Sequence, residues 1–249
     1  YITVVEPFIR SLWSLEAANA NASDVFVFWC AVGATLNARI HEPELVRREV
    51  ANQVVAIFNK RYSAFFSNEF YFVAFMMDPS DGLRLVLPAQ GSSVTIRPSV
   101  NRMPFNAAYQ RVKEYLKSML KAMLHVAATT PEKGDPLLVK LGAKAAANEL
   151  KIQVEAWWRR AGLWQFDTGL STENPLEWWE SIAKHTHGRI LGLPASTIFS
   201  ALINSMPDER TNSNITWLNS AIRGSQQPRT IMDHVAIRQW YTKHDVREQ

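Results

Sequence analysis

The chain has 249 residues, of which 47% are hydrophobic and 20% charged, so its composition is that of a globular protein and excludes a disordered or fibrous one. Such a chain buries about 70–75% of the surface that its unfolded form exposes, enough for one large domain or two modest ones. The single cysteine, Cys30, permits no internal disulfide and excludes a structural zinc site built on thiolates. No apolar run approaches the ~20 residues that cross a bilayer, so we expect a nuclear or cytoplasmic protein without a membrane partner.

Position 1 is Tyr1 instead of methionine, and apolar residues at helical spacing begin at Ile2. We therefore expect a fragment or a processed product, and secretion directed by a preceding segment stays open.

The first 66 residues predict three helices, over residues 2–18, over 24–40 behind a Ser23 cap, and over 43–66 with Pro43 at the first helical position. The apolar run of residues 70–77 is a buried helix or a buried strand, and periodicity does not choose between them. Between residues 83 and 98, apolar and polar residues alternate and several residues are β-branched, which indicates a short hairpin or an extended linker around Gly91.

The remaining pattern is helical. We expect helices over residues 104–127 and 137–162, the second of them broken near Gly142, and a further helix opened by Pro175. Short helical pieces continue to residue 203, and residues 209–222 and 230–243 complete the prediction. The expected fold class is therefore mainly α, with any strands confined to residues 83–96 or to the C-terminal third.

Positive charge concentrates in the middle of the chain. Residues 101–160 contain eleven Lys or Arg and five acids, a net charge of +6 against +4 for the whole chain. Lys113, Lys117 and Lys121 follow one another at four-residue intervals, opposite the apolar positions of the helix expected there. The row is a candidate site for DNA phosphates, bound weakly and without sequence preference, although the pattern by itself favours a solvated helix face.

Other chemistry-bearing residues are sparse, and the usual hydrolase and nucleotide-binding motifs are absent. His185 and His187 have no evident third metal ligand, so structural or surface roles are favoured. The pairs Trp157-Trp158 and Trp178-Trp179 favour core packing over base stacking, with one member of each pair inward and the other at a boundary. For the acids at 208 and 209 next to Arg210, the residues alone favour helix capping over catalysis.

Several segments of the last third occur in a recognisable order: Asn174-Pro-Leu-Glu-Trp-Trp-Glu180, Leu193-Pro-Ala-Ser196, Ser205-Met-Pro-Asp-Glu-Arg-Thr-Asn-Ser213, Thr216-Trp-Leu-Asn-Ser220 and Ile237-Arg-Gln-Trp-Tyr241. Together they resemble the C-terminal region of hAT-superfamily DNA transposases, particularly the forms abundant in basidiomycete fungi. Upstream segments, among them Phe58-Asn-Lys-Arg-Tyr62 and Asp78-Pro79, resemble the part that precedes this region, so the similarity covers nearly the whole chain.

The resemblance implies a helical insertion domain followed by a C-terminal remnant of a ribonuclease-H-like core. It implies the divisions 1–100 (insertion domain), 101–170 (basic helical segment and linker) and 171–249 (last part of the core, with dimerisation). Glu209 corresponds to the third acid of the DDE triad that binds Mg²⁺, and Arg210 adjoins it as a candidate nucleic-acid contact. Asn212 stands where the family commonly has Phe.

The two aspartates of that triad precede the insertion in the family, and Asp78 is not one of them. A triad acid alone cannot hold two metal ions, so we expect this chain to be inactive alone and to lack a cofactor of its own. The expected function is that of a transposase portion, or of a domesticated relative, which supplies Glu209 and an association surface for a homo-oligomer. The alternative is a catalytically silent protein that binds nucleic acid or a host protein, including a fungal effector-like role.

Overall fold

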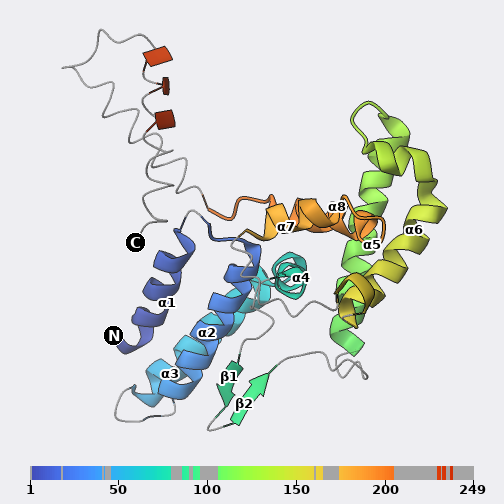
Figure 1. The fold of residues 1–249 in the computed structure, drawn as a ribbon. Coiled ribbons are helices and arrows are strands. Elements are labelled where there is room, and N and C mark those ends of the chain that lie inside the picture. Colours follow the sequence, from blue (N-terminus) through green and yellow to red (C-terminus); the bar gives the residue numbers. More distant parts are fainter. Residues whose placement is uncertain are drawn as a thin grey trace. The chain divides into compact units, whose positions relative to one another are not determined.

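The computed structural model describes residues 2–17, 19–40, 42, 46–79, 86–89, 92–95, 106–159, 161–164 and 174–204, with 229–230, 232–233 and 236–237 near the C-terminus. The chain divides into two compact units, Tyr1–Leu15 with Asn19–Leu202, and Glu16–Ala18 with Ile203–Gln249. The first unit contains the long helices of Figure 1. Its elements are α1 (Ile2–Leu15), α2 (Ala22–Ile40), α3 (Arg48–Phe65), α4 (Phe70–Met77), β1 (Val86–Ala89), β2 (Ser92–Thr95), α5 (Asn106–Thr129), α6 (Pro136–Trp158), η2 (Gly162–Trp164), α7 (Pro175–Ile182) and α8 (Arg189–Phe199).

The expectation of a mainly helical chain is confirmed over the described residues. The segment between 83 and 96 contains the antiparallel pair β1–β2, in which Val86 lies opposite Thr95 and Ala89 opposite Ser92. In the described part of the chain no helix is long and apolar enough to span a membrane. The helices predicted over residues 209–222 and 230–243 lie largely outside the described residues.

Two predicted helix starts are wrong. α2 begins at Ala22, because the side chain of Asn21 accepts a hydrogen bond from the Ser23 amide while Asp24 accepts one from the Asn21 amide, both at 2.8 Å. This reciprocal pair is a capping box, and it places Ser23 inside the helix. α3 begins at Arg48, five residues after the expected proline, and residue 43 itself lies outside the described residues.

α1 contains a proline, which has no amide hydrogen to donate to the carbonyl four residues earlier. The helix nevertheless continues through Pro7, because Arg39 of α2 donates from Nη1 to the orphaned Thr3 carbonyl at 2.8 Å. The same nitrogen lies 3.0 Å from Glu6, which also pairs with Arg10 at 2.6 Å. The Arg39 guanidinium therefore supplies the hydrogen bond that Pro7 cannot donate, and it holds α1 against α2.

The apolar run of residues 70–77 is a helix, α4, and its last five residues are buried. Aromatic rings from α2 and α3 pack against it: Phe26 stacks on Phe75 at 4.9 Å, and Phe65 stacks on Tyr71 at 4.7 Å. A helix that is apolar on all sides is stable in water only when neighbours cover every face. The choice between helix and strand was therefore made by packing.

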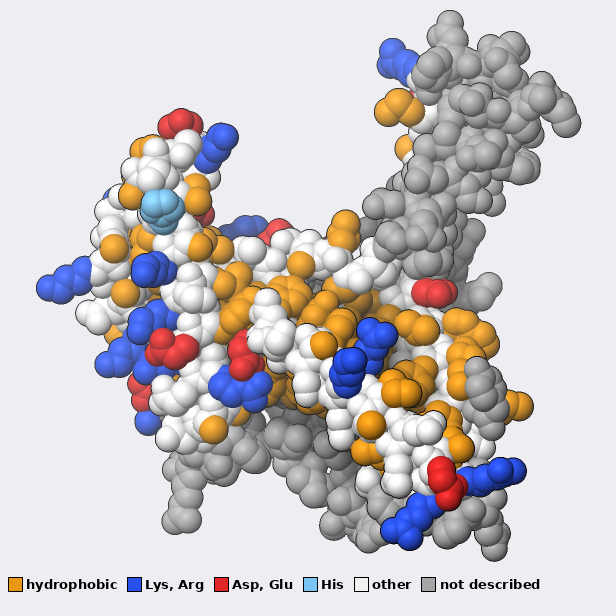
Figure 2. All heavy atoms as spheres, turned by 180° about the vertical axis from the view of Figure 1, so that it is seen from behind, with side chains coloured by type: hydrophobic (Ala, Val, Ile, Leu, Met, Phe, Trp, Pro, Cys, Tyr) orange, Lys and Arg blue, Asp and Glu red, His pale blue; other side chains and the backbone are white. Residues whose placement is uncertain are grey.

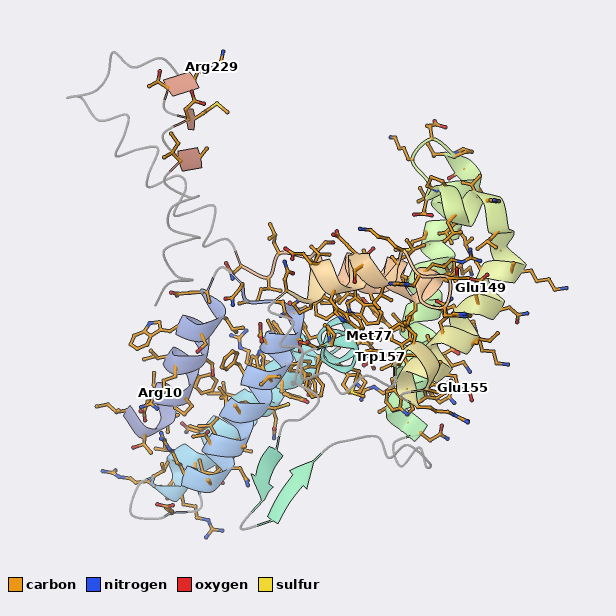
Figure 3. All side chains as sticks on the ribbon, viewed as in Figure 1. Arg10, Met77, Glu149, Glu155, Trp157 and Arg229 are labelled. Atoms are coloured by element: carbon orange, nitrogen blue, oxygen red, sulfur yellow. The ribbon has the colours of Figure 1, made fainter. Side chains whose placement is uncertain are left out.

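The C-terminal carbonyls of α4 have no partner within the helix and end in a buried region. Two indole N–H groups supply the missing donors: Trp157 of α6 donates to Met76 O at 3.3 Å, and Trp179 of α7 donates to Met77 O at 2.9 Å. Figure 3 shows Met77 and Trp157 close together between α4 and α6. Tryptophan provides both the donor and the large apolar surface that this position requires.

The N-terminus of α8 is capped by a residue of another helix. Gln153 of α6, 4% exposed, accepts hydrogen bonds from the amides of Ile190 at 3.1 Å and Leu191 at 2.8 Å. On the same contact, Arg189 forms a two-bond ion pair with Glu149 at 2.6 and 3.0 Å, which raises the pKa of the guanidinium. These bonds fix α8 against α6.

We predict that Trp179→Phe lowers the free energy of unfolding by about 2–4 kcal/mol, because it removes the donor of a buried carbonyl and leaves a small void. The measurement is urea denaturation followed by circular dichroism at 222 nm. Trp178→Phe is the matched control: its indole is only half buried, and the expected loss is about 1 kcal/mol. Equal losses in the two variants would contradict the role given to the bond to Met77.

Candidate nucleic-acid interface

The basic middle of the chain folds as an antiparallel helical hairpin, α5–α6. α5 presents buried residues at helical spacing, and α6 meets them with a similar apolar stripe; these residues are Tyr109, Val112, Leu116, Leu120 and Ala127 of α5, and Leu138, Ala146, Leu150, Val154, Trp157 and Trp158 of α6. Each helix therefore has one face committed to the core and another face left to solvent.

The end of the hairpin is built from short-range signals. Asp135 accepts a hydrogen bond from the Leu137 amide at 2.8 Å, with Pro136 as the first helical residue. Gly134 passes so close to α5 that an added Cβ would lie 2.5 Å from the Cα atom of Ala127. Gly142 has φ +73°, in the left-handed region that favours glycine, and it makes the kink expected there.

The acids of the hairpin are mostly neutralised by specific partners. Glu149 pairs with Arg189, Glu155 with Arg159 at 2.7 Å, and Glu114 with Lys117 at 3.3 Å. Arg111 pairs in turn with Glu69, just before α4, and lies 4.1 Å over the ring of Phe72.

Six lysines of the hairpin, in contrast, form no ion pair within the described residues: Lys113, Lys121, Lys133, Lys140, Lys144 and Lys151. Figure 2 shows the resulting surface, with Lys and Arg side chains projecting from the hairpin. The excess positive charge of the sequence is therefore exposed.

The predicted row of Lys113, Lys117 and Lys121 lies on α5 but is not a uniform face. Four residues advance a helix by about 40° beyond one turn, so the row turns away from the buried stripe as it proceeds. Lys113 is half buried, with its ammonium 5.8 Å from the Tyr109 ring, whereas Lys121 is exposed. The expectation that all three oppose the apolar positions is therefore wrong for Lys113.

Sequence reasoning did not single out the lysines of α6. Lys144 and Lys151 are seven residues apart, so they share one face about 10 Å apart along the axis, and both are exposed. Lys140 is also exposed but precedes the kink at Gly142, so helical periodicity does not place it with them. The i, i+7 spacing was the signal that could have identified the pair.

The two tryptophan pairs pack in the core or at its boundary, as favoured. Trp157, Trp164, Trp178 and Trp179 form one cluster with ring centroids 4.8–6.1 Å apart. The expected division into one inward and one boundary residue holds for Trp178 and Trp179 but is wrong for the other pair. Trp157 and Trp158 are each 3% exposed, because α5, α7 and η2 cover different sides of the end of α6.

The candidate catalytic residue Glu209 and its neighbour Arg210 lie outside the described residues. His185 and His187 are exposed between α7 and α8, and no group of three or more potential metal ligands occurs among the residues that the structure describes. The described residues therefore give no geometry for the implied Mg²⁺ site.

A shallow hollow of about 400 Å³ adjoins the lysine row and is lined by Glu69, Gln110, Arg111, Glu114 and Tyr115. Its two carboxylates are both paired, Glu69 with Arg111 and Glu114 with Lys117. The hollow therefore offers no unpaired cation to an anion.

Comparison of the chain with protein-family models, with curated proteins and with solved structures gives no match.

We predict that Glu114→Gln strengthens binding of the hairpin to polyanions, because it removes a negative charge and releases Lys117 from its ion pair. The pair is exposed, so the free energy of unfolding should change by only a few tenths of a kcal/mol. The measurement is the salt concentration of elution from heparin. Glu180→Gln on α7 makes the same change in net charge away from the hairpin; an equal shift for both variants would contradict the prediction.

Proposed function

We propose that this chain is a DNA-contacting portion of an hAT-like transposase, or of a domesticated relative, and that it does not cleave DNA alone. The proposal combines the order of sequence segments that resemble the family with one structural observation. That observation is a helical hairpin on which six lysines form no ion pair within the described residues, five of them exposed and Lys113 half buried, while its acids are largely paired with specific partners.

Exposed lysines on a rigid hairpin suit contact with phosphates. Each ammonium is a compact point charge that displaces a counterion from the duplex without reading a base edge. Most lysines of α5 and α6 are exposed, so their ammonium groups are accessible to a polyanion. We therefore assign the hairpin a positioning role, in which DNA is held weakly and without sequence preference.

The finer assignments rest on the resemblance. In this proposal residues 1–100 and 101–170 belong to the helical insertion, and residues 171–249 form the last part of a ribonuclease-H-like core that contributes Glu209 to a Mg²⁺ site. Two segments of the resemblance form local structures of their own: the Asn174 side chain caps α7 by accepting from the Leu176 amide at 3.1 Å, and Leu193-Pro-Ala-Ser196 lies within α8. Self-association through apolar residues after position 203 belongs to the same proposal.

The second candidate is a catalytically silent interaction protein that binds a host protein. An effector-like role of the chain belongs to this candidate. The observation that favours it is the exposure of Trp13, 69%, and of neighbouring apolar residues of α1. A protein that binds DNA only through scattered charge does not need such a surface.

We predict weak binding of the chain to random duplex DNA at low salt. The variant Lys113→Ala/Lys117→Ala/Lys121→Ala should lower the slope of log K against log salt by up to about 2–3, with the smallest part from the half-buried Lys113. Lys140→Ala/Lys144→Ala/Lys151→Ala should lower it by a similar amount, because these residues are exposed. Fluorescence anisotropy with a labelled 20-base-pair duplex measures the slope.

The control removes three exposed cations outside the hairpin, as Lys60→Ala/Arg61→Ala/Lys184→Ala. Its net charge equals that of the two test variants, so a purely global charge effect would give three equal slopes. Slopes equal to wild type in both hairpin variants would reject the DNA-positioning role and favour the silent interaction protein.

We predict no Mg²⁺-dependent nicking or strand transfer by the purified chain, because Glu209 is the only triad acid that the resemblance assigns to it. Glu209→Ala should therefore leave the background of a gel-based nicking assay unchanged. If Glu209 caps a helix, the substitution costs about 1 kcal/mol of stability without changing activity. Specific cleavage of a duplex that disappears in this variant would show that the chain is an enzyme by itself.

A further inference from the structure

α1 exposes apolar side chains on the side that faces away from α2. Ile2 is 78% exposed, Leu12 60%, Trp13 69% and Ile9 41%, and Val5 between them is half buried. Figure 2 shows apolar side chains on the surface of the first unit. Single exposed apolar residues are ordinary, but four on one face of a fourteen-residue helix form a continuous patch.

The spacing of this patch is that of a coiled-coil seam. Residues 2, 5, 9 and 12 are separated by three, four and three positions, which are the a and d positions of two heptads. β-branched residues occupy both a positions, and Val5 and Leu12 occupy the d positions. A helix that only covered its own core would turn such a seam inward, yet here α2 packs on the other side, where Pro7 is buried.

The seam is held rigidly, and its exposed side chains are apolar. Arg39 fixes α1 by its bonds to Thr3 and Glu6, so the helix is already formed when a partner arrives. Glu6, the acid nearest the seam, is neutralised by Arg39 and Arg10. The exposed side chains along the seam are apolar, so the surface fits a second apolar helix.

We propose that α1 binds α1 of a second copy of this chain, antiparallel across a two-fold axis. The seam is its own complement in that arrangement: when residue i faces residue 14 − i, Ile2 faces Leu12 of the other copy and Val5 faces Ile9. A two-fold contact of this kind is isologous, closes on itself and cannot grow into a filament. Trp13 lies beside the seam, where a large ring covers its end.

The size of the patch fits a weak dimer. Three aliphatic side chains and one tryptophan at these exposures provide on the order of 400 Å² per copy, or about 800 Å² in total. This is below the range of stable interfaces, so the dimer should form with a dissociation constant on the order of 10–100 µM. The proposal is independent of DNA binding, and also of the association expected for residues after 203.

The test is sedimentation velocity of the full chain from 2 to 200 µM. For the wild type we expect the weight-average mass to rise from the monomer value of 28.3 kDa toward twice that value. Ile2→Glu or Leu12→Lys alone should weaken association at least tenfold, because each places a charge against an apolar residue of the other copy. Ile57→Lys on α3, at a position 62% exposed, is the matched control and should associate like wild type.

The double variant Ile2→Glu/Leu12→Lys tests the direction of packing. In the antiparallel arrangement each introduced acid faces an introduced base, so association should recover to within about threefold of wild type. A parallel pair would instead bring like charges together. Circular dichroism checks that each variant is folded. We expect folding to be retained because the substituted positions are exposed.

A monomer at all concentrations, association unchanged by both single variants, or no recovery in the double variant would each overturn the proposal. Persistent dimerisation of the single variants would place the contact elsewhere, for example after residue 203. Because the readout is mass without DNA, failure of the α1 contact leaves the DNA-binding prediction unaffected, and the reverse also holds.

Discussion

The described fold depends on how the carboxyl end of α4 is satisfied. This helix is apolar on all sides and is therefore buried, and a buried helix end leaves carbonyl groups that neither water nor the helix itself can pair. The indoles of Trp157 and Trp179 donate to the last two carbonyls from two other helices. Because those donors come from α6 and α7, the second half of the unit is fixed around the end of the first half.

This constraint gives α6 several roles at once. Its inward face carries the indole that pairs with α4 and Gln153, which caps α8. Glu149 pairs with Arg189 and Glu155 pairs with Arg159, so lysines supply most of the remaining charge on the outer face. The positive surface of the hairpin therefore follows from the pairing of most of its acids, as well as from the number of its lysines.

The two candidate surfaces have opposite chemistry and lie on different helices. The α5–α6 hairpin presents dispersed positive charge, which suits a polyanion and weakens with salt. The outer face of α1 is apolar with its one neighbouring acid neutralised, which suits another apolar helix and is little affected by salt. Salt dependence therefore separates the two activities in a single preparation.

The sequence by itself determined the helical class, the helix opened by Pro175 and the break near Gly142, and it limited residues 83–98 to a short hairpin or an extended linker, since these depend on local propensity and backbone geometry. It also carried the resemblance that underlies the proposed function. Only the tertiary structure decided that the run ending at Met77 is a helix and that Trp157 and Trp158 are both buried. It also decided that Lys113 is partly covered while Lys144 and Lys151 are exposed. These outcomes depend on which neighbour covers a side chain or removes its charge, and that information lies in residues distant along the chain.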